Sequence, residues 1–173
     1  MSFVMGPLAI VGIFAGAGAS LKLADYLGEN SQGITAYASA ILSGALLGVL
    51  MHIGPEESSY ALGIVLGVAF SGKINRPNLI VGLLTVGAVV FPLGLSTPYL
   101  WLVVTVTILS LVDEVGHDYF SDKLSYACVL FRYRASLKVG TIFLSVATLI
   151  SLTTTLGFLC FDLSYDLTSH FIE

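Results

Sequence analysis

Long apolar runs separated by short polar segments dominate the chain. Uncharged runs occupy residues 3–21, 34–51 and 139–160, and each approaches the ~20 residues that an α-helix needs to cross about 30 Å of hydrocarbon. None alternates strictly between apolar and polar residues, as a membrane-spanning strand would. Because a helix satisfies its backbone hydrogen bonds without water, the pattern predicts an all-α fold, a polytopic integral membrane bundle.

Turn residues divide the remaining apolar sequence into further helices. Residues 77–112 carry no charge and are too many for one span, and Pro92 and Pro98 mark a turn inside that stretch. Residues 113–138 hold no apolar run long enough to cross, so we expect them at the membrane surface. A single domain, residues 1–173, is therefore expected to contain six spans: 3–22, 33–53, 58–72, 78–95, 98–116 and 139–161.

Composition agrees with the membrane class. Hydrophobic residues make up 56% of the chain, charged residues 10%, and the mean hydropathy is +0.94, whereas soluble domains average about 45–50% apolar and roughly 25% charged residues. The first residues lack the basic segment and cleavage pattern of a signal peptide, so we expect them to remain as the first span. Membrane lipids are the expected surroundings, and no nucleic-acid partner is expected.

The predicted spans separate the charges by sign. One face of the membrane receives all seven basic residues, Lys22, Lys73, Arg76, Lys123, Arg132, Arg134 and Lys138. The other face receives only acids, Glu56, Glu57, Asp162, Asp166 and Glu173. The positive-inside rule assigns the basic face to the cytoplasm. The expected location is therefore the cell membrane, in a multi-pass arrangement with both termini extracytoplasmic.

Two similar polar octets end two of the predicted spans. Residues 23–30 read LADYLGEN and residues 111–118 read LVDEVGHD. A second pair of matched segments, RPNLIVG at 76–82 and RASLKVG at 134–140, opens two other spans. The matched elements run in the same direction across the membrane, which favours a parallel internal duplication with halves 1–95 and 96–173. Chance similarity between apolar segments explains the match equally well.

The octets are candidates for metal binding. Residues three and four apart share a helix face, which joins Asp25 to Glu29 and Glu114 to His117 and Asp118. Oxygen ligands suit Mg²⁺ or Mn²⁺, and one available histidine argues against a closed zinc site. The predicted metal ligands are Asp25, Glu29, Asp113, Glu114 and Asp118. The alternative is that these acids are solvated or paired with neighbouring bases.

The basic residues are candidates for phosphate binding. Arginine binds phosphate with two parallel hydrogen bonds and lysine supplies a mobile charge. The candidate phosphate ligands are Lys73, Arg76, Arg132, Arg134 and Lys138. Alternatively, these residues only set the topology and contact anionic lipid headgroups.

Three functions fit the pattern. The first is a metal-dependent membrane enzyme that acts on a lipid-linked phosphate or pyrophosphate at the cytoplasmic interface, with Asp113 and His117 as catalytic residues and His117 as acid or base. The second is a small transporter or channel for an ion or an uncharged solute, although no ionisable residue is expected midway along a span. The third is a non-catalytic subunit that docks a cytoplasmic partner, so enzyme status stays open.

Glycines spaced four residues apart predict close helix packing. They occur at Gly12 and Gly16, at Gly44 and Gly48, and at Gly63 and Gly67. Small residues one turn apart let two helix backbones approach closely. The sequence allows this packing within one chain or in a homo-oligomer.

Overall fold

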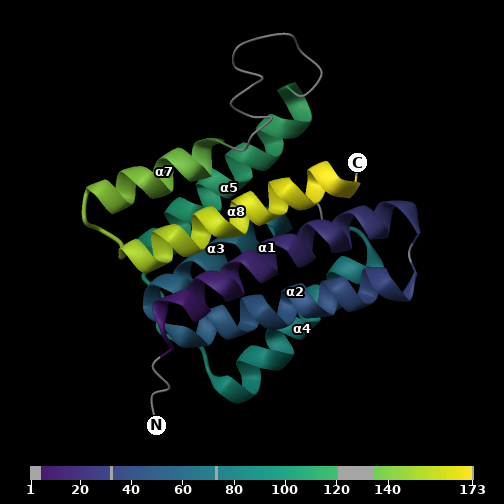
Figure 1. Ribbon diagram of the computed structural model, residues 1–173, viewed down its shortest axis with the longest axis horizontal. Helices are drawn as coiled ribbons and strands as arrows, with labels where there is room; N and C mark the ends of the chain where they lie inside the picture. The colour runs from purple at the N-terminus through teal and green to yellow at the C-terminus, as the bar shows by residue number, and fades with distance from the viewer. Residues whose placement is uncertain (1–4, 32, 73, 121–134, 173) are drawn as a thin grey trace.

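The computed structural model describes residues 5–31, 33–72, 74–120 and 135–172 (Figure 1). These residues form helices and no strand, which confirms the all-α prediction. The helices are α1 (Pro7–Asn30), α2 (Ile34–Ile53), α3 (Pro55–Phe70), α4 (Pro77–Leu93), α5 (Leu100–Phe120), α7 (Ala135–Val146) and α8 (Leu152–Ile172).

Helices from the two ends of the chain form the centre of the bundle. α1 and α8 pack side by side, with α4 and α7 along opposite edges (Figure 1). The pair is parallel: Gly157 lies against the Phe14 ring, and farther along Gly18 lies against the Phe161 backbone. Ser164 Oγ donates a hydrogen bond to the Ala15 carbonyl at 2.7 Å. The missing side chain of glycine permits this close approach.

The prediction of a sixth span at 139–161 is wrong. That segment contains parts of two helices, α7 and α8, joined by residues 147–151. Thr148 adopts a left-handed backbone with φ of 56°, which is uncommon for a β-branched residue. Ser151 then caps α8, because the Thr154 N–H donates to its hydroxyl at 3.2 Å. The uncharged run contains no proline or glycine at this turn, so hydropathy concealed it.

This additional turn reverses the direction of the last helix. The described chain therefore begins and ends at opposite ends of the bundle (Figure 1). Asp162 and Asp166 lie beside Lys138, so their predicted placement on the face opposite the basic residues is also wrong.

The other five predicted spans each coincide with one helix, with shifted ends. Among the described residues, α1 and α2 are long and apolar enough to cross a membrane, and α4 and α7 are shorter apolar helices. A buried helix of a soluble protein or an N-terminal signal sequence would meet the same criterion. Length and composition alone therefore leave the polytopic arrangement as a proposal.

Glycine packing occurs between helices of the same chain. Gly44 of α2 lies against the Gly82 carbonyl of α4, while Gly63 and Gly67 of α3 lie against Val106 and Ser110 of α5. These two glycine faces are thus filled within the chain. At the third glycine pair, a Cβ added at Gly12 would meet no atom of the described residues within 4 Å, so a homo-oligomer through that face stays a prediction.

Candidate functional site

Three buried carboxylates surround one small cavity. Asp113 and Glu114 come from α5 and Asp162 from the middle of α8, with exposed fractions of 2%, 6% and 6%. The cavity has a volume of about 40 Å³, which is room for a few water molecules at ~10–15 Å³ each. Ser110 and Tyr165 add polar groups to its lining. We call this cavity the carboxylate pocket.

Lys138 lies beside the pocket in the first turn of α7. Its Nζ is 2.7 Å from Asp162 Oδ2 and 3.0 Å from Asp166 Oδ2. The Asp162 side chain is 8% exposed and the Asp166 side chain 37% exposed. One ammonium group therefore bridges a buried carboxylate and a more accessible one, four residues apart on the same helix.

A second cation approaches the pocket from α1. Lys22 Nζ lies 5.7 Å from the centroid of the Tyr165 ring, within the range of a cation–π interaction. Tyr165 itself lines the pocket. Carboxylates and an aromatic ring thus line the pocket, and the ammonium groups of Lys138 and Lys22 lie against two of its lining residues, Asp162 and Tyr165.

Asp113 also joins α5 to α7. One carboxylate oxygen accepts the Ser136 N–H at 2.9 Å and the other accepts the Leu137 N–H at 2.8 Å. The first backbone N–H groups of a helix have no partner within the helix and carry partial positive charge. Asp113 therefore caps α7 from a different helix.

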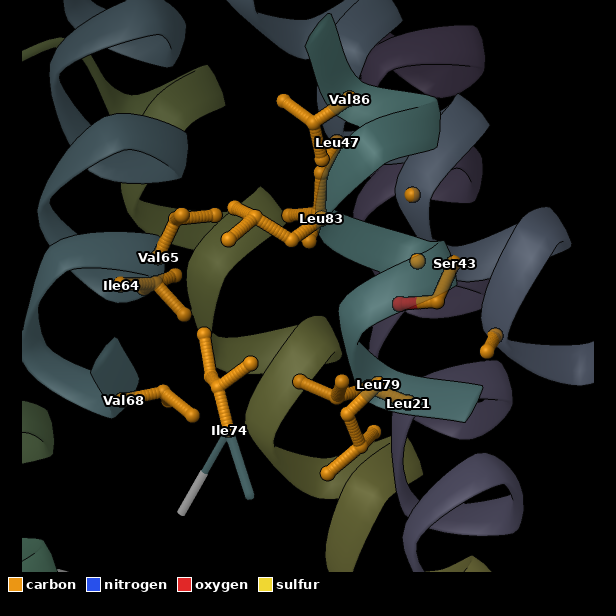
Figure 2. Close-up of a pocket in the computed structure, with 13 residues that line it drawn as sticks. Leu21, Ser43, Leu47, Ile64, Val65, Val68, Ile74, Leu79, Leu83 and Val86 are labelled. Carbon is orange, nitrogen blue, oxygen red and sulfur yellow. The ribbon is translucent and has the colours of Figure 1, made fainter. Parts of the chain in front are cut away.

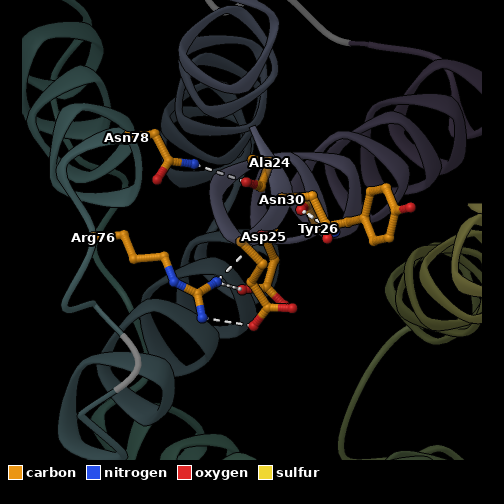
Figure 3. Close-up of polar contacts among 7 residues, drawn as sticks. Ala24, Asp25, Tyr26, Asn30, Arg76 and Asn78 are labelled. Carbon is orange, nitrogen blue, oxygen red and sulfur yellow. Dashed lines mark hydrogen bonds and ion pairs between the residues drawn. The ribbon is translucent and has the colours of Figure 1, made fainter. Parts of the chain in front are cut away.

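The first octet makes a related contact with α4, shown in Figure 3. Arg76 Nη1 donates to Asp25 Oδ1 at 3.1 Å, and Arg76 Nη2 donates to Glu29 Oε1 at 2.6 Å. Asn78 Nδ2 donates to the Ala24 carbonyl at 2.7 Å. Each octet therefore binds the first residues of a helix that carries one of the two matched segments.

The structure separates the predicted ligands of one metal site. Asp25 and Glu29 bind α4, whereas Asp113 binds α7, and these helices lie on opposite edges of the bundle (Figure 1). No group of three or more His, Cys, Asp or Glu side chains suited to a metal ion occurs in the described part of the chain. The side chains of His117 and Asp118 lie outside the described residues. Binding of Mg²⁺ or Mn²⁺ stays a prediction.

The predicted phosphate ligands have carboxylate partners where they are described. Arg76 pairs with Asp25 and Glu29, and Lys138 pairs with Asp162 and Asp166. The other three candidates, Lys73, Arg132 and Arg134, lie outside the described residues. A phosphate group at Arg76 or Lys138 would compete with these carboxylates for the same cation.

The role of Asp162 was missed in the sequence. The expectation that no ionisable residue lies midway along a span followed from ending the last span at residue 161. Because α8 begins at Leu152, Asp162 falls at its centre between buried Phe158, Phe161 and Tyr165. The capping residues Ser151 and Thr154 are the signal that would have located this helix.

Two more carboxylates lie at the opposite end of the bundle, in the first turn of α3. Glu56 Oε2 accepts the Ser151 N–H at 2.9 Å and the Thr154 hydroxyl at 2.8 Å. Glu57 Oε1 lies 3.1 Å from the same hydroxyl. Pro55 opens the helix, which agrees with a capped helix start. We call Glu56 and Glu57 the acidic pair.

A separate cavity between α1, α2, α3 and α4 is almost entirely aliphatic, as Figure 2 shows. Its volume is about 50 Å³. The Ser43 hydroxyl at its wall already donates to the Ala17 carbonyl at 3.3 Å. The described lining of this cavity contains no charged group, in contrast to the carboxylate pocket.

No protein-family model, no curated protein and no solved structure matches this chain. The geometry of the site is therefore the basis for its function.

Proposed function

We propose that this chain is an integral membrane protein that conducts protons through the carboxylate pocket. The observation that carries the proposal is the enclosure of Asp113, Glu114 and Asp162 around one cavity beside Lys138. Ionisable groups inside a membrane bundle are costly and typically belong to ion pathways or proton relays. This proposal develops the transporter or channel alternative of the sequence.

The surface of the bundle supports its membrane location. Large apolar side chains are exposed on helix after helix, including Leu8 at 89%, Phe91 at 93% and Val146 at 78%. Further examples are Ile34, Leu84, Leu100, Val139, Phe143 and Leu152. Hydrocarbon would cover such a surface, whereas soluble proteins rarely expose large contiguous apolar patches.

The helix directions also change the membrane orientation that was predicted from the sequence. The described basic residues Lys22, Arg76 and Lys138 all contact groups toward the end of the bundle where α1 and α8 finish. The positive-inside rule then assigns this end to the cytoplasm. The start of α1 is extracytoplasmic in this proposal, and the end of α8 is cytoplasmic.

Lys138 provides a switch for proton movement. A proton that reaches Asp162 neutralises its carboxylate and removes the charge that attracts Lys138. The ammonium group then pairs with Asp166 alone, which lies closer to solvent. Loss of the proton from Asp162 restores the bridge between both carboxylates. One buried acid thus gains and loses a proton without leaving an isolated charge in the bundle, which would be very costly.

The metal-dependent enzyme and the docking subunit receive less support from the geometry. Asp25 and Glu29 are engaged with α4 and Asp113 with α7, and the described basic candidates have carboxylate partners. Both functions remain predictions without a contact in their favour among the described residues.

Proton flux into liposomes tests the proposal. Purified protein is reconstituted in vesicles containing a pH-sensitive dye, and a potassium gradient with valinomycin supplies the voltage. We expect the wild type to acidify the lumen and Asp162→Asn to lose this flux. Glu29→Gln is the matched control, because its ion pair with Arg76 lies outside the pocket. Wild-type vesicles that acidify no faster than empty ones contradict the proposal.

A further inference from the structure

A buried polar pair lies between the acidic pair and the carboxylate pocket. The Tyr60 hydroxyl of α3 donates to Thr141 Oγ1 of α7 at 3.1 Å, and both residues are fully buried. The Tyr60 ring packs against Phe158 with 5.4 Å between ring centroids. Phe158 in turn lines the carboxylate pocket. The pair is therefore enclosed in the core of the bundle, next to the proposed proton site.

Helix spacing places this pair in line with the charged groups at both ends. Glu57 lies three residues before Tyr60 on α3, and Lys138 lies three residues before Thr141 on α7. Residues three apart are neighbours on one helix face. Glu57 is 8% exposed, so this acid is itself buried. The two helix spacings thus connect Glu57 to Lys138 through the hydrogen-bonded hydroxyls of Tyr60 and Thr141.

We propose that Tyr60 and Thr141 relay protons between the acidic pair and the carboxylate pocket. This inference rests on the proposed function and assigns a path to it. Hydroxyl groups suit the task because each can accept one proton while it donates another. The proposed path requires water molecules between Glu57 and Tyr60 and between Thr141 and Asp162.

One transfer moves one proton and leaves no net charge on either hydroxyl. The protonated Glu57 carboxyl gives its proton to the Tyr60 oxygen, either directly or through water. The O–H bond of Tyr60 breaks as its proton passes to Thr141 Oγ1, and the original Thr141 proton leaves through water for the Asp162 carboxylate. Glu57 ends ionised and Asp162 ends neutral. Rotation of the two hydroxyls then restores the starting arrangement.

Buried tyrosine hydroxyls also need a hydrogen-bond partner for stability alone. The two roles separate experimentally, because a purely structural pair would affect unfolding and leave the flux of the folded protein unchanged.

Three substitutions test the relay in the liposome assay. Tyr60→Phe removes the phenolic oxygen and keeps the ring, and Thr141→Val removes the second hydroxyl and keeps the shape. Thr141→Ser retains that hydroxyl. We expect the first two to lower proton flux by about tenfold or more, equivalent to ~1.4 kcal/mol of added barrier. Thr141→Ser should stay within about threefold of the wild type, equivalent to ~0.7 kcal/mol.

The controls distinguish failure of the relay from failure of the proposed function. Circular dichroism in detergent identifies the folded variants. If Tyr60→Phe does not fold, the comparison of Thr141→Val with Thr141→Ser decides the outcome. If Tyr60→Phe and Thr141→Val both conduct protons at the wild-type rate and Asp162→Asn conducts none, the relay is overturned and proton conduction is retained. Absence of flux in the wild type overturns both.

Discussion

Replacing Asp113 with alanine tests the joint between α5 and α7. The wild-type carboxylate is 2% exposed and accepts two backbone N–H groups, from Ser136 and Leu137. The variant leaves both donors without this acceptor at the start of a helix. A buried donor without a partner costs about 1–3 kcal/mol, and partial access of water to the half-buried Ser136 reduces its share. We therefore expect a loss of about 2–4 kcal/mol in the free energy of unfolding.

Chemical unfolding in detergent, followed by circular dichroism, measures this loss. Hydrogen exchange locates this loss. The exchange rates of the Ser136 and Leu137 amides should rise from the wild type to the variant by more than the rates of the amides in α1 and α2. Asp166→Ala is the control, since its more exposed ion pair with Lys138 should contribute at most ~1 kcal/mol. An Asp113→Ala protein that unfolds within about 0.5 kcal/mol of the wild type, a shift typical of surface substitutions, refutes the assignment of Asp113 as the cap of α7.

Other contacts give further predictions, all measured by unfolding in detergent. Arg76→Ala should lower stability by about 1 kcal/mol, because the two ion pairs of its half-exposed guanidinium are screened by solvent; no loss contradicts its role in joining α1 to α4. Asn78→Ala should cost about 1–2 kcal/mol by leaving the buried Ala24 carbonyl without its donor. Gly18→Val should cost ~1–3 kcal/mol or more because α8 occupies the new side-chain position, whereas Gly12→Val, with open space there, should be nearly neutral. Equal effects of the two valines would refute the close packing of α1 and α8.

Much of the helical framework could be predicted from hydropathy because five apolar runs end at charged or turn residues. α3 begins at Pro55 and α4 at Pro77, and the turn that includes Pro98 precedes α5. The turn at residues 147–151 could not be predicted in this way, since every residue around it is uncharged. Local capping and a left-handed threonine determine that turn, and hydropathy does not register either one.

The candidate site was predicted only in part. The similar octets predicted polar contacts for Asp25 and Asp113, and both make tertiary contacts, although Asp113 lies within α5 and not at its end. Their partners could not be predicted, because the contacts depend on which helix start folds against each octet. Asp162 was placed on the wrong face through the missed turn, and the burial of Tyr60 against Thr141 depends on packing between α3 and α7. Periodicity within one helix carries no information about such pairs.

The most direct test of proton conduction is the reversal potential of the wild-type protein in a planar bilayer with different pH on the two sides and equal salt. Proton conduction predicts a current whose reversal potential shifts by about 59 mV per pH unit, the voltage equivalent of a tenfold gradient of a singly charged ion. A reversal potential that follows an imposed sodium or potassium gradient and ignores pH would contradict the account.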